Sequence, residues 1–565
     1  MLSIRKISAI GRTYRGLNRF RRIITVLLKY GFGDVLELLK IDQYVEAGLK
    51  MISKKQTVRV EKLGRPEGFR MALEELGPTY IKLGQILSTR PDLIPIDFLN
   101  ELTKLQDKVP PFPFRSVEKI IEAELGFSLE TLFARFDEKP LASASIGQVH
   151  RAQLKSGETV AVKIQRPGIQ RVIEIDLEIM LYLATLLEHH VEEIALHRPV
   201  TIVEEFARTL EKELDYLLEA SNMERVALNF VDDPNIVIPN IHRDFSTSKV
   251  LTAEFIDGIK VSEIEKLENA GLNRRIITDR GADVLLKQIF DHGFFQADPH
   301  PGNIFVLPGN VICLIDFGMV GSVDRKTREI FVDLIDSVVR RDASQTAEVF
   351  LQLTDWDDAP NRRRFEKDVA DFMDRHLYRP LKDVRVGKLL HQLLELSSRY
   401  RLRIPPDIFL MMKALTTIEG VARMLDPDFE MIAKTAPFVK RLMLGRFTPQ
   451  RISGELYRIA ADMMRFGEQF PKDLLEITRL IRQQKLQINI ENPGLERTLS
   501  THDQISNRIS FSVIIASLII GSALIVISEI PPLFYGISLI GIILFLAAAI
   551  MGIWLLVAII RKGRL

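Results

Sequence analysis

Residues 292–318, HGFFQADPHPGNIFVLPGNVICLIDFG, form the stretch that decides the fold of this chain. Within it, Asp298 and Asn303 stand in a D-x-x-x-x-N spacing, and Asp316 begins an Asp-Phe-Gly triplet. Two apolar, β-branched runs flank Pro308-Gly309-Asn310, and this pattern predicts a β-hairpin. The open end of the hairpin would bring Asn303 next to Asp316. An amide oxygen and a carboxylate held on strands suit Mg²⁺, which takes its remaining ligands from phosphates and water.

The composition excludes several classes of protein. A chain of 565 residues has room for two or three domains. Lys and Arg number 76 against 74 Asp and Glu, a net charge of +2, so we expect no nucleic-acid partner. Cys313 is the only cysteine, which excludes a disulfide framework or a cysteine metal site and suits a reducing compartment.

The first thirty residues are basic, with eight Lys or Arg and no acidic residue. Three interpretations stay open: an amphipathic helix lying on anionic lipid, an organelle transit peptide, or a solvated basic helix. A secretory signal is excluded, because no continuous apolar core follows the early charges.

The C-terminus predicts a membrane hairpin. Residues 511–528 and 533–560 are long, apolar and uncharged, and each is able to cross a hydrocarbon core of ~30 Å. Basic residues lie at both outer ends, at Arg508 and after residue 560, while the short connection carries one Glu. The positive-inside rule then places the main body on the cytosolic face of an inner membrane, or on the matrix or stromal face in an organelle.

The remaining sequence divides into segments by its hydrophobic periodicity. A mostly helical extension spans residues 1–125, a small mixed lobe 126–260, and a larger helical lobe 261–485. A polar linker at 486–507 leads to the two membrane helices at 508–565. The predicted fold class is therefore α+β, helix-rich and two-lobed.

A second group of charged residues precedes the metal-type motif. Lys163 ends the strand pattern Val-Ala-Val-Lys, in the order in which kinases place a phosphate-contacting lysine before their metal ligands. Such a lysine needs an acidic partner, and the helix over 211–221 offers Glu213, Asp215 and Glu219. Acid spacing alone favours an ordinary charged helix surface.

The loop before the lysine strand is a candidate phosphate cover. Its sequence, PLASASIGQV at 140–149, has one glycine where a glycine-rich loop would have several. Glu254 and Phe255 fall, by position only, where a kinase hinge would contact adenine. The nucleotide-binding candidates in and after the loop are Ala142, Ser143, Ala144, Ser145, Ile146, Gly147, Val149 and Lys163.

Together these motifs resemble the UbiB (ABC1/ADCK) family of atypical protein-kinase-like proteins across nearly the full length. GPTYIKLGQILSTRPDLIP at 77–95 carries that family's KxGQ signature at Lys82, Gly84 and Gln85. LASASIGQVHRA resembles its alanine-rich loop, VAVK its strand lysine, and Glu213-Leu214-Asp215 its ExD motif. ADPHPGN and DFG complete the set.

The resemblance implies an atypical kinase-like fold and a role for each motif. It pairs Lys163 with Glu219, makes Lys163 and Asp298 catalytic, and makes Asn303 and Asp316 ligands of Mg²⁺ or Mn²⁺ beside ATP or ADP. The KxGQ element would fold over the pocket where a peptide substrate would otherwise bind, with Lys82 facing Glu213 and Asp215. Two departures, Ser143 for a common alanine and Gln296 for a common histidine, remove no charged group.

The function implied is a membrane-bound atypical kinase or ATPase that supports synthesis of ubiquinone or a related isoprenoid quinone. Its implied partners are membrane lipid, quinone precursors and quinone-biosynthesis enzymes, and a homodimer is one option. Two alternatives stay open: a kinase acting on a protein or a small membrane molecule, and a nucleotide-dependent scaffold. The residues themselves also indicate that the parts of a kinase that hold a peptide substrate are missing. No Ala-Pro-Glu motif follows Asp316, and no Arg stands directly before Asp298.

Overall fold

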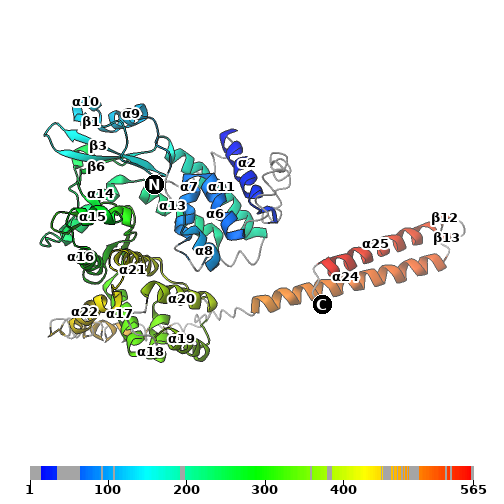
Figure 1. Cartoon of the computed structure of the whole chain (residues 1–565). Helices are drawn as coiled ribbons and strands as arrows, with labels where there is room; N and C mark the ends of the chain where they lie inside the picture. Colours follow the sequence, from blue (N-terminus) through cyan, green and yellow to red (C-terminus); the bar gives the residue numbers. More distant parts are fainter. Residues whose placement is uncertain are drawn as a thin grey trace. The chain divides into compact units, whose positions relative to one another are not determined.

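The structure is a computed structural model with two compact units, Met1–Ile452 and Ser453–Leu565 (Figure 1). It describes residues 14–34, 64–88, 90, 93–105, 109–190, 198–356, 359–377, 385–446, short stretches between 448 and 482, 495–528, 531–534 and 537–561. The second unit begins earlier than the linker predicted at 486. Within the described residues the molecule is helix-rich with mainly antiparallel sheets, so the predicted α+β class is confirmed.

The predicted mixed lobe is a five-stranded sheet. Its strands are β1 (Phe133–Phe136), β2 (Ala142–Ser143), β3 (Gly147–Leu154), β4 (Thr159–Gln165) and β6 (Val250–Glu254). The order is β1-β3-β4-β6, with β2 paired to β3, and every pairing is antiparallel. Alternate residues of β4 are fully buried, at Val160, Val162 and Ile164. They pack with α9 (Phe114–Leu125) and the short α10 (Leu129–Leu132) in a separate small core.

Helices from the N-terminal extension pack beside helices that follow the sheet. They are α2 (Tyr14–Lys29), α6 (Arg65–Leu76), α7 (Pro78–Leu87), α8 (Ile96–Leu102), α11 (Ile169–His190), α13 (Pro199–Glu213) and α14 (Tyr216–Asn229). In Figure 1, α6 and α7 lie beside α11 and α13, and α7 contacts both.

Helix α2 belongs to this core. Its residues Ile23 and Ile24 are buried, and Arg19 pairs with the fully buried Asp176 of α11 at 2.6 Å. Lys29 likewise pairs with Glu75 at 2.6 Å. Because protein covers the apolar face of α2, that face is not available to lipid; the remainder of the basic segment, residues 1–13, lies outside the described residues.

The predicted β-hairpin is present in a second sheet. Its strands are β5 (Ile236–Val237), β7 (Ile259–Lys260), β9 (Ile304–Leu307) and β10 (Val311–Leu314), in the order β5-β10-β9-β7. Leu307 pairs with Val311 across the turn, where Gly309 and Asn310 both adopt positive φ. The short strands β8 (Phe294–Gln296) and β11 (Val320–Ser322) come before and after this hairpin in the chain, and they pair with each other.

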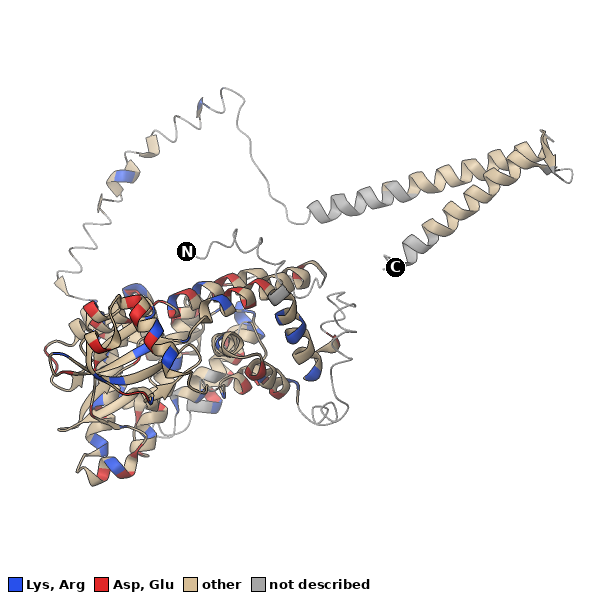
Figure 2. Cartoon of the chain, turned by 90° about the horizontal axis from the view of Figure 1, so that it is seen from above, with Lys and Arg blue, Asp and Glu red and all other residues tan. Residues whose placement is uncertain are grey.

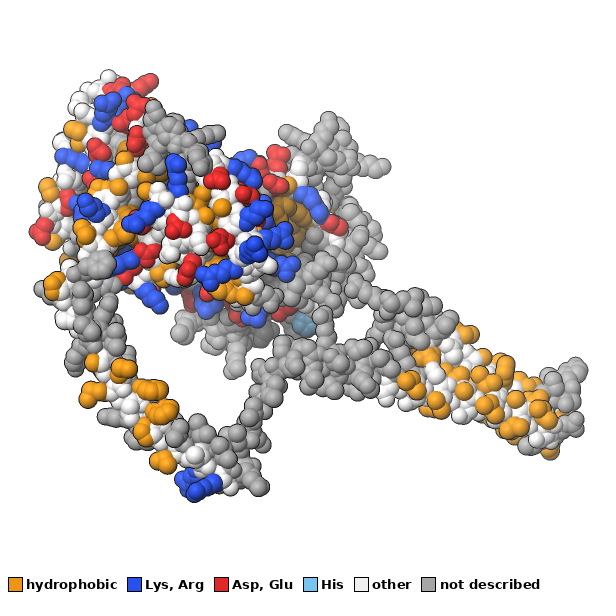
Figure 3. All heavy atoms as spheres, turned by 90° about the horizontal axis from the view of Figure 1, so that it is seen from below, with side chains coloured by type: hydrophobic (Ala, Val, Ile, Leu, Met, Phe, Trp, Pro, Cys, Tyr) orange, Lys and Arg blue, Asp and Glu red, His pale blue; other side chains and the backbone are white. Residues whose placement is uncertain are grey.

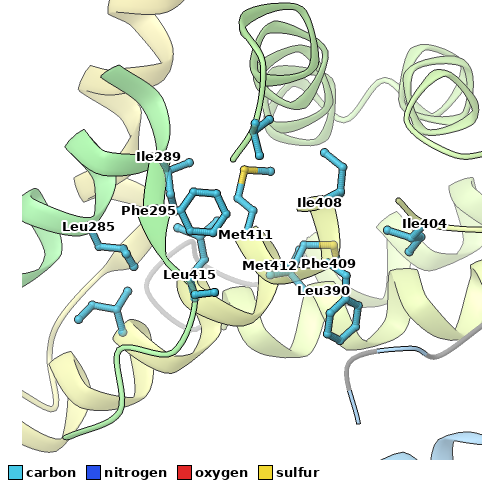
Figure 4. Close-up of a cluster of buried hydrophobic side chains, with 14 of the residues drawn as sticks. Leu285, Ile289, Phe295, Leu390, Ile404, Ile408, Phe409, Met411, Met412 and Leu415 are labelled. Atoms are coloured by element: carbon cyan, nitrogen blue, oxygen red, sulfur yellow. The ribbon is translucent and has the colours of Figure 1, made fainter. Parts of the chain in front are cut away.

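The described residues between 261 and 485 are mostly helical, apart from strands β8 to β11. They contain α15 (Ile264–Asn269), α16 (Arg274–Leu286), the π-helix η2 (Lys287–His292), α17 (Arg325–Arg340), α18 (Ala343–Gln352), α19 (Arg362–Leu377), α20 (Val386–Arg399), α21 (Pro406–Leu425) and α22 (Met431–Gly445). Two 3₁₀ turns, η1 (Arg243–Phe245) and η3 (Pro301–Asn303), complete the chain of elements. Helix α21 packs against α16 and α20, and Figure 4 shows its Met411 and Leu415 beside Phe295 of β8.

The second unit contains a pair of apolar helices, α24 (Leu495–Ile527) and α25 (Leu539–Arg561), which pack against each other. Charged side chains are interspersed over the first unit, whereas the described parts of α24 and α25 carry mostly apolar ones (Figures 2 and 3). Among the described residues, Ile509–Ile527 is long and apolar enough to cross a membrane, with a mean hydropathy of 2.5, and Leu539–Leu555 is a shorter apolar helix. One predicted span thus has support, and the second stays a prediction.

The elements of this unit differ in extent from the predicted segments. Residues 495–507, within the predicted linker, form the first part of α24, and no Gly or Pro interrupts the helix after Gly494. The second apolar stretch begins with the paired strands β12 (Leu533–Phe534) and β13 (Ile537–Ser538), so α25 starts at Leu539. An uninterrupted apolar run hides this change from strand to helix.

Candidate functional site

The strand lysine and its acidic partner meet as predicted. Lys163 on β4 donates to both carboxylate oxygens of Glu219 on α14, each at 2.8 Å, and the Glu219 side chain is 5% exposed. Burial alone would lower the pKa of Lys163, but the charges of Glu219 and Asp316 raise it above its ordinary value. The ammonium therefore stays charged beside Asp316.

Asp316 is held at the mouth of the hairpin. Its Oδ1 accepts a hydrogen bond from Gly318 N at 3.0 Å, and Phe317 is fully buried. Burial would raise the pKa of Asp316, whereas the Lys163 charge, the Gly318 hydrogen bond and the Lys82 charge hold it below its ordinary value. Asp316 is thus a carboxylate at neutral pH.

Two amides fix the backbone around Asp316. Gln296 donates from Nε2 to the Asp316 carbonyl, and Asn222 of α14 donates from Nδ2 to the Phe317 carbonyl at 3.1 Å. Gln296 therefore supplies a backbone contact at the position where the family often has histidine.

Asn303 lies at the other open end of the hairpin. Its carbonyl accepts from Ile315 N at 3.2 Å, so the residue stands next to the Asp316 backbone. Asn303 and Asp316 provide one amide and one ionised carboxylate, a donor set that fits Mg²⁺ when phosphates and water complete the shell. No group of three or more His, Cys, Asp or Glu that could bind a metal occurs among the described residues.

The alanine-rich loop carries buried hydroxyls. Within the described structure, Ser143 Oγ and Ser145 Oγ are buried with no hydrogen-bond partner, as is the hydroxyl of Tyr216. The backbone closes tightly here, since a Cβ on Gly147 would lie 2.3 Å from that hydroxyl and 2.7 Å from the Ile164 carbonyl. Buried polar groups normally find a partner, so these hydroxyls fit a polar ligand at the loop.

The remaining nucleotide candidates lie around this loop and the end of β6. Ala142 pairs with Val149 across β2 and β3, Ala144 N donates to the Gly147 carbonyl at 2.8 Å, and Ile146 is buried. Glu254 N donates to the Asn240 carbonyl at 2.8 Å and Phe255 N to the Thr159 carbonyl at 3.0 Å. Both hinge N–H groups are thus engaged within the protein, and neither is free to donate to a base.

The KxGQ helix meets the ExD acid. Lys82 Nζ of α7 lies 3.2 Å from Glu213 Oε2 at the end of α13, with side chains 13% and 7% exposed. Asp215 has a different contact, because its side chain accepts from Leu217 N at 3.0 Å and caps α14. A Cβ on Gly84 would lie 2.3 Å from Leu105 Cδ1, so this glycine permits close helix packing, and Gln85 follows it on the same helix.

Asp298 stands between β8 and η3, and a residue that the sequence analysis missed lies beside it. Lys413 Nζ of α21 is 3.7 Å from Asp298 Oδ1. A signal existed: Lys413 is the single charged residue between Asp407 and Glu419, in a mostly apolar stretch of the helix. Tyr216, whose ring lies 5.2 Å below Lys163 Nζ, is a second residue that spacing did not reveal.

Comparison with known proteins gives matches along most of the chain. Residues 104–350 match the ABC1 atypical kinase-like domain, residues 369–430 the UbiB helical domain, and residues 493–561 the ABC1/UbiB kinase-like C-terminal domain. A probable protein kinase UbiB of Marinobacter nauticus is 36% identical over 482 residues, which cover 84% of this chain and 86% of that protein. The chain belongs to the UbiB/ABC1 atypical kinase-like family.

Two further matches were found. An uncharacterized protein in the hydrogenase 1 5′ region of Clostridium pasteurianum is 32% identical over 547 residues, covering 97% of this chain and 99% of that protein. The solved Rv3197–erythromycin complex from Mycobacterium tuberculosis aligns with a TM-score of 0.46 and 24% identity, over 70% of this chain and 98% of that chain. The UbiB/ABC1 match covers the segments that bear Lys163, Asp298, Asn303 and Asp316.

Proposed function

We propose that this UbiB/ABC1 protein is a Mg²⁺-dependent ATPase that supports synthesis of ubiquinone or a related isoprenoid quinone at a membrane. One observation carries the enzymatic part: the Lys163–Glu219 ion pair stands in the field of the ionised Asp316, and Asn303 adjoins Asp316 through the hairpin. An inert scaffold has no need for a charged lysine and a charged carboxylate in one half-buried site, since burying charge is costly.

Each residue has a role in this proposal. Lys163 binds nucleotide phosphates, Asn303 and Asp316 hold Mg²⁺ or Mn²⁺, and Asp298 accepts a proton from the attacking oxygen. The metal, when bound, neutralises charge on the phosphates. The loop of Ser143 and Ser145 covers ATP or ADP with its buried hydroxyls.

The geometry around α7 favours hydrolysis or a small acceptor over a peptide substrate. Lys82 attaches α7 to the end of α13 through Glu213, close enough to Asp316 to affect its pKa. In this proposal α7 occupies the acceptor side of the site. A peptide would have to break the Lys82–Glu213 contact, whereas water or a small phenolic molecule would not.

The apolar helices supply the membrane part of the proposal. Residues Ile509–Ile527 anchor the protein, α25 returns beside α24, and the body faces the cytosol by the charge rule given above. This arrangement would make membrane lipid and quinone precursors the natural effectors, and quinone-biosynthesis enzymes the natural protein partners.

The test measures phosphate release by full-length protein in nanodiscs containing anionic lipid, with and without a phenolic quinone precursor. Wild type is expected to hydrolyse Mg²⁺-ATP faster when precursor is present. Asp298→Asn is expected to hydrolyse it at least ~100-fold more slowly than wild type under the same conditions. Asp336→Asn, in an exposed i,i+4 pair with Arg340, is the matched control and should keep wild-type activity. Wild-type protein that releases no phosphate, or an Asp298→Asn variant as active as wild type, would overturn the proposal. Transfer of label from ATP to a protein would favour the kinase alternative.

A further inference from the structure

Lys413 occupies an unusual position on α21. Its neighbours in sequence, Met412 and Ala414, are buried, and the helix packs against α16 and α20 (Figure 4). The side chain of Lys413 is 29% exposed, and its Nζ lies 3.7 Å from Asp298 Oδ1, whose side chain is 45% exposed. A long apolar stem thus holds one ammonium at the edge of the site.

The stretch around Asp298 lacks any other strong cation. Residues 292–318 contain no Lys or Arg. The imidazole of His300 accepts the Gly302 amide hydrogen at Nδ1, 3.1 Å away, so this nitrogen donates nothing to a phosphate. Lys163, which binds nucleotide phosphates in the proposed function, pairs with Glu219 and lies in the field of Asp316. Among the described residues, the cation that pairs with Asp298 is Lys413.

The contact between Lys413 and Asp298 is unlike an ion pair built for stability. At 3.7 Å it is longer than a hydrogen bond, whereas the Lys163–Glu219 contacts are 2.8 Å. Half-exposed ion pairs of this kind add only about 0–1 kcal/mol to stability. Both groups also keep solvent-exposed surface, so a phosphate oxygen has room to approach the ammonium.

We propose that Lys413 is a catalytic residue that contacts the terminal phosphate during its transfer. This inference rests on the proposed function. The attacking water or hydroxyl forms a bond to the terminal phosphorus as the bond to the bridging oxygen of ADP breaks. Asp298 takes the proton of the attacking oxygen, and the electron pair of the broken bond goes to ADP. Lys413 stays protonated throughout and neutralises charge on the transferred oxygens, as fixed cations do in phosphoryl transfer.

The test compares Lys413→Met and Lys413→Arg in the full-length protein. Methionine keeps the apolar stem and removes the charge, so helix packing is preserved. Lys434→Met is the matched control, because Lys434 is 24% exposed and pairs with Asp283 at 3.0 Å. For each variant we would measure kcat and KM for phosphate release, Mg²⁺-nucleotide affinity by titration, and Tm.

Lys413→Met is expected to lower kcat by ~100-fold, with nucleotide affinity within about threefold of wild type and an unchanged Tm. Lys413→Arg should recover at least ~10-fold of that loss, because it restores the charge, and Lys434→Met should keep wild-type kcat. A Lys413→Met variant with wild-type kcat would overturn the inference while leaving the proposed function intact. A lowered kcat that Lys413→Arg fails to recover, or one matched by a fall in Tm, would also overturn it. Wild-type protein without any phosphate release would instead contradict the proposed function.

Discussion

Two Lys–Glu ion pairs lie near Asp316, and they differ in the length and number of their contacts. On the sheet side, Lys163 meets Glu219 through two contacts of 2.8 Å between β4 and α14. On the side of the N-terminal extension, Lys82 meets Glu213 at 3.2 Å between α7 and α13. Both lysines lower the pKa of Asp316, Lys163 more than Lys82.

The difference separates a permanent part of the site from a removable one. Lys163 and Glu219 both lie within the matched kinase-like domain, and their bidentate contact fixes α14 to the sheet. Lys82 comes from residues before that domain and makes the looser contact. We infer that the first pair assembles the nucleotide site and that the second pair closes it.

The largest expected effect comes from breaking the first pair. Lys163→Met leaves the Glu219 carboxylate buried and unpaired, which should cost about 3–5 kcal/mol of unfolding free energy. Urea titration measures this loss. Lys249→Met is the control, because its pair with Glu124 at 2.6 Å has a lysine side chain that is 45% exposed, and it should cost under ~1 kcal/mol. Equal losses in the two variants would contradict the structural role of the first pair.

Breaking the second pair should have a smaller effect on stability and a visible effect on activity. Lys82→Ala leaves Glu213 buried without its ammonium, at a cost of roughly 2–3 kcal/mol. It should also change the rate of ATP hydrolysis several-fold or produce self-phosphorylation, because α7 is released. Lys29→Ala, which breaks the Lys29–Glu75 pair, is the control and should leave the rate unchanged. A Lys82→Ala protein with wild-type hydrolysis and no self-labelling would remove the distinction between the pairs.

The smallest expected effect concerns the loop that meets the first pair. Gly147→Ala introduces a methyl group 2.7 Å from the Ile164 carbonyl, and the necessary shift should cost roughly 1–2 kcal/mol. Thermal unfolding measures it. Gly281→Ala in α16, where an added Cβ has open space, should raise stability by up to ~1 kcal/mol. A neutral Gly147→Ala variant would show that the loop is less tightly closed than the structure indicates.

Local patterns predicted the hairpin and its neighbours well. The turn at Gly309 and Asn310 and the β-branched runs around it specify a register that requires no distant contact. The strand of Lys163 is likewise predicted from its local pattern. Three acidic residues were candidates for the partner of Lys163, and only the family resemblance selected Glu219. The structure places that pair at 2.8 Å.

Contacts between distant segments could not be predicted. Lys413 reaches Asp298 from a helix far along the chain, and no spacing rule links the two residues. Helix α2 was ambiguous because one amphipathic face serves a lipid surface or a protein core equally well. The sequence analysis offered a lipid-bound helix, a transit peptide or a solvated helix, and none of these included the core packing that the Arg19–Asp176 pair with α11 shows.

The central claim is that Asp316, kept ionised by Lys163, binds the metal that brings the nucleotide to the site. Titration of Mg²⁺-ATP into full-length wild type and Asp316→Asn tests it directly. Wild type should bind Mg²⁺-ATP, and its free energy of unfolding should rise by about 2.7 kcal/mol when the ligand concentration is a hundred times Kd. Asp316→Asn, which removes the charge and keeps the shape, should bind at least ~10-fold more weakly and lose most dependence on Mg²⁺. Equal Mg²⁺-dependent affinity in the two proteins would contradict the account.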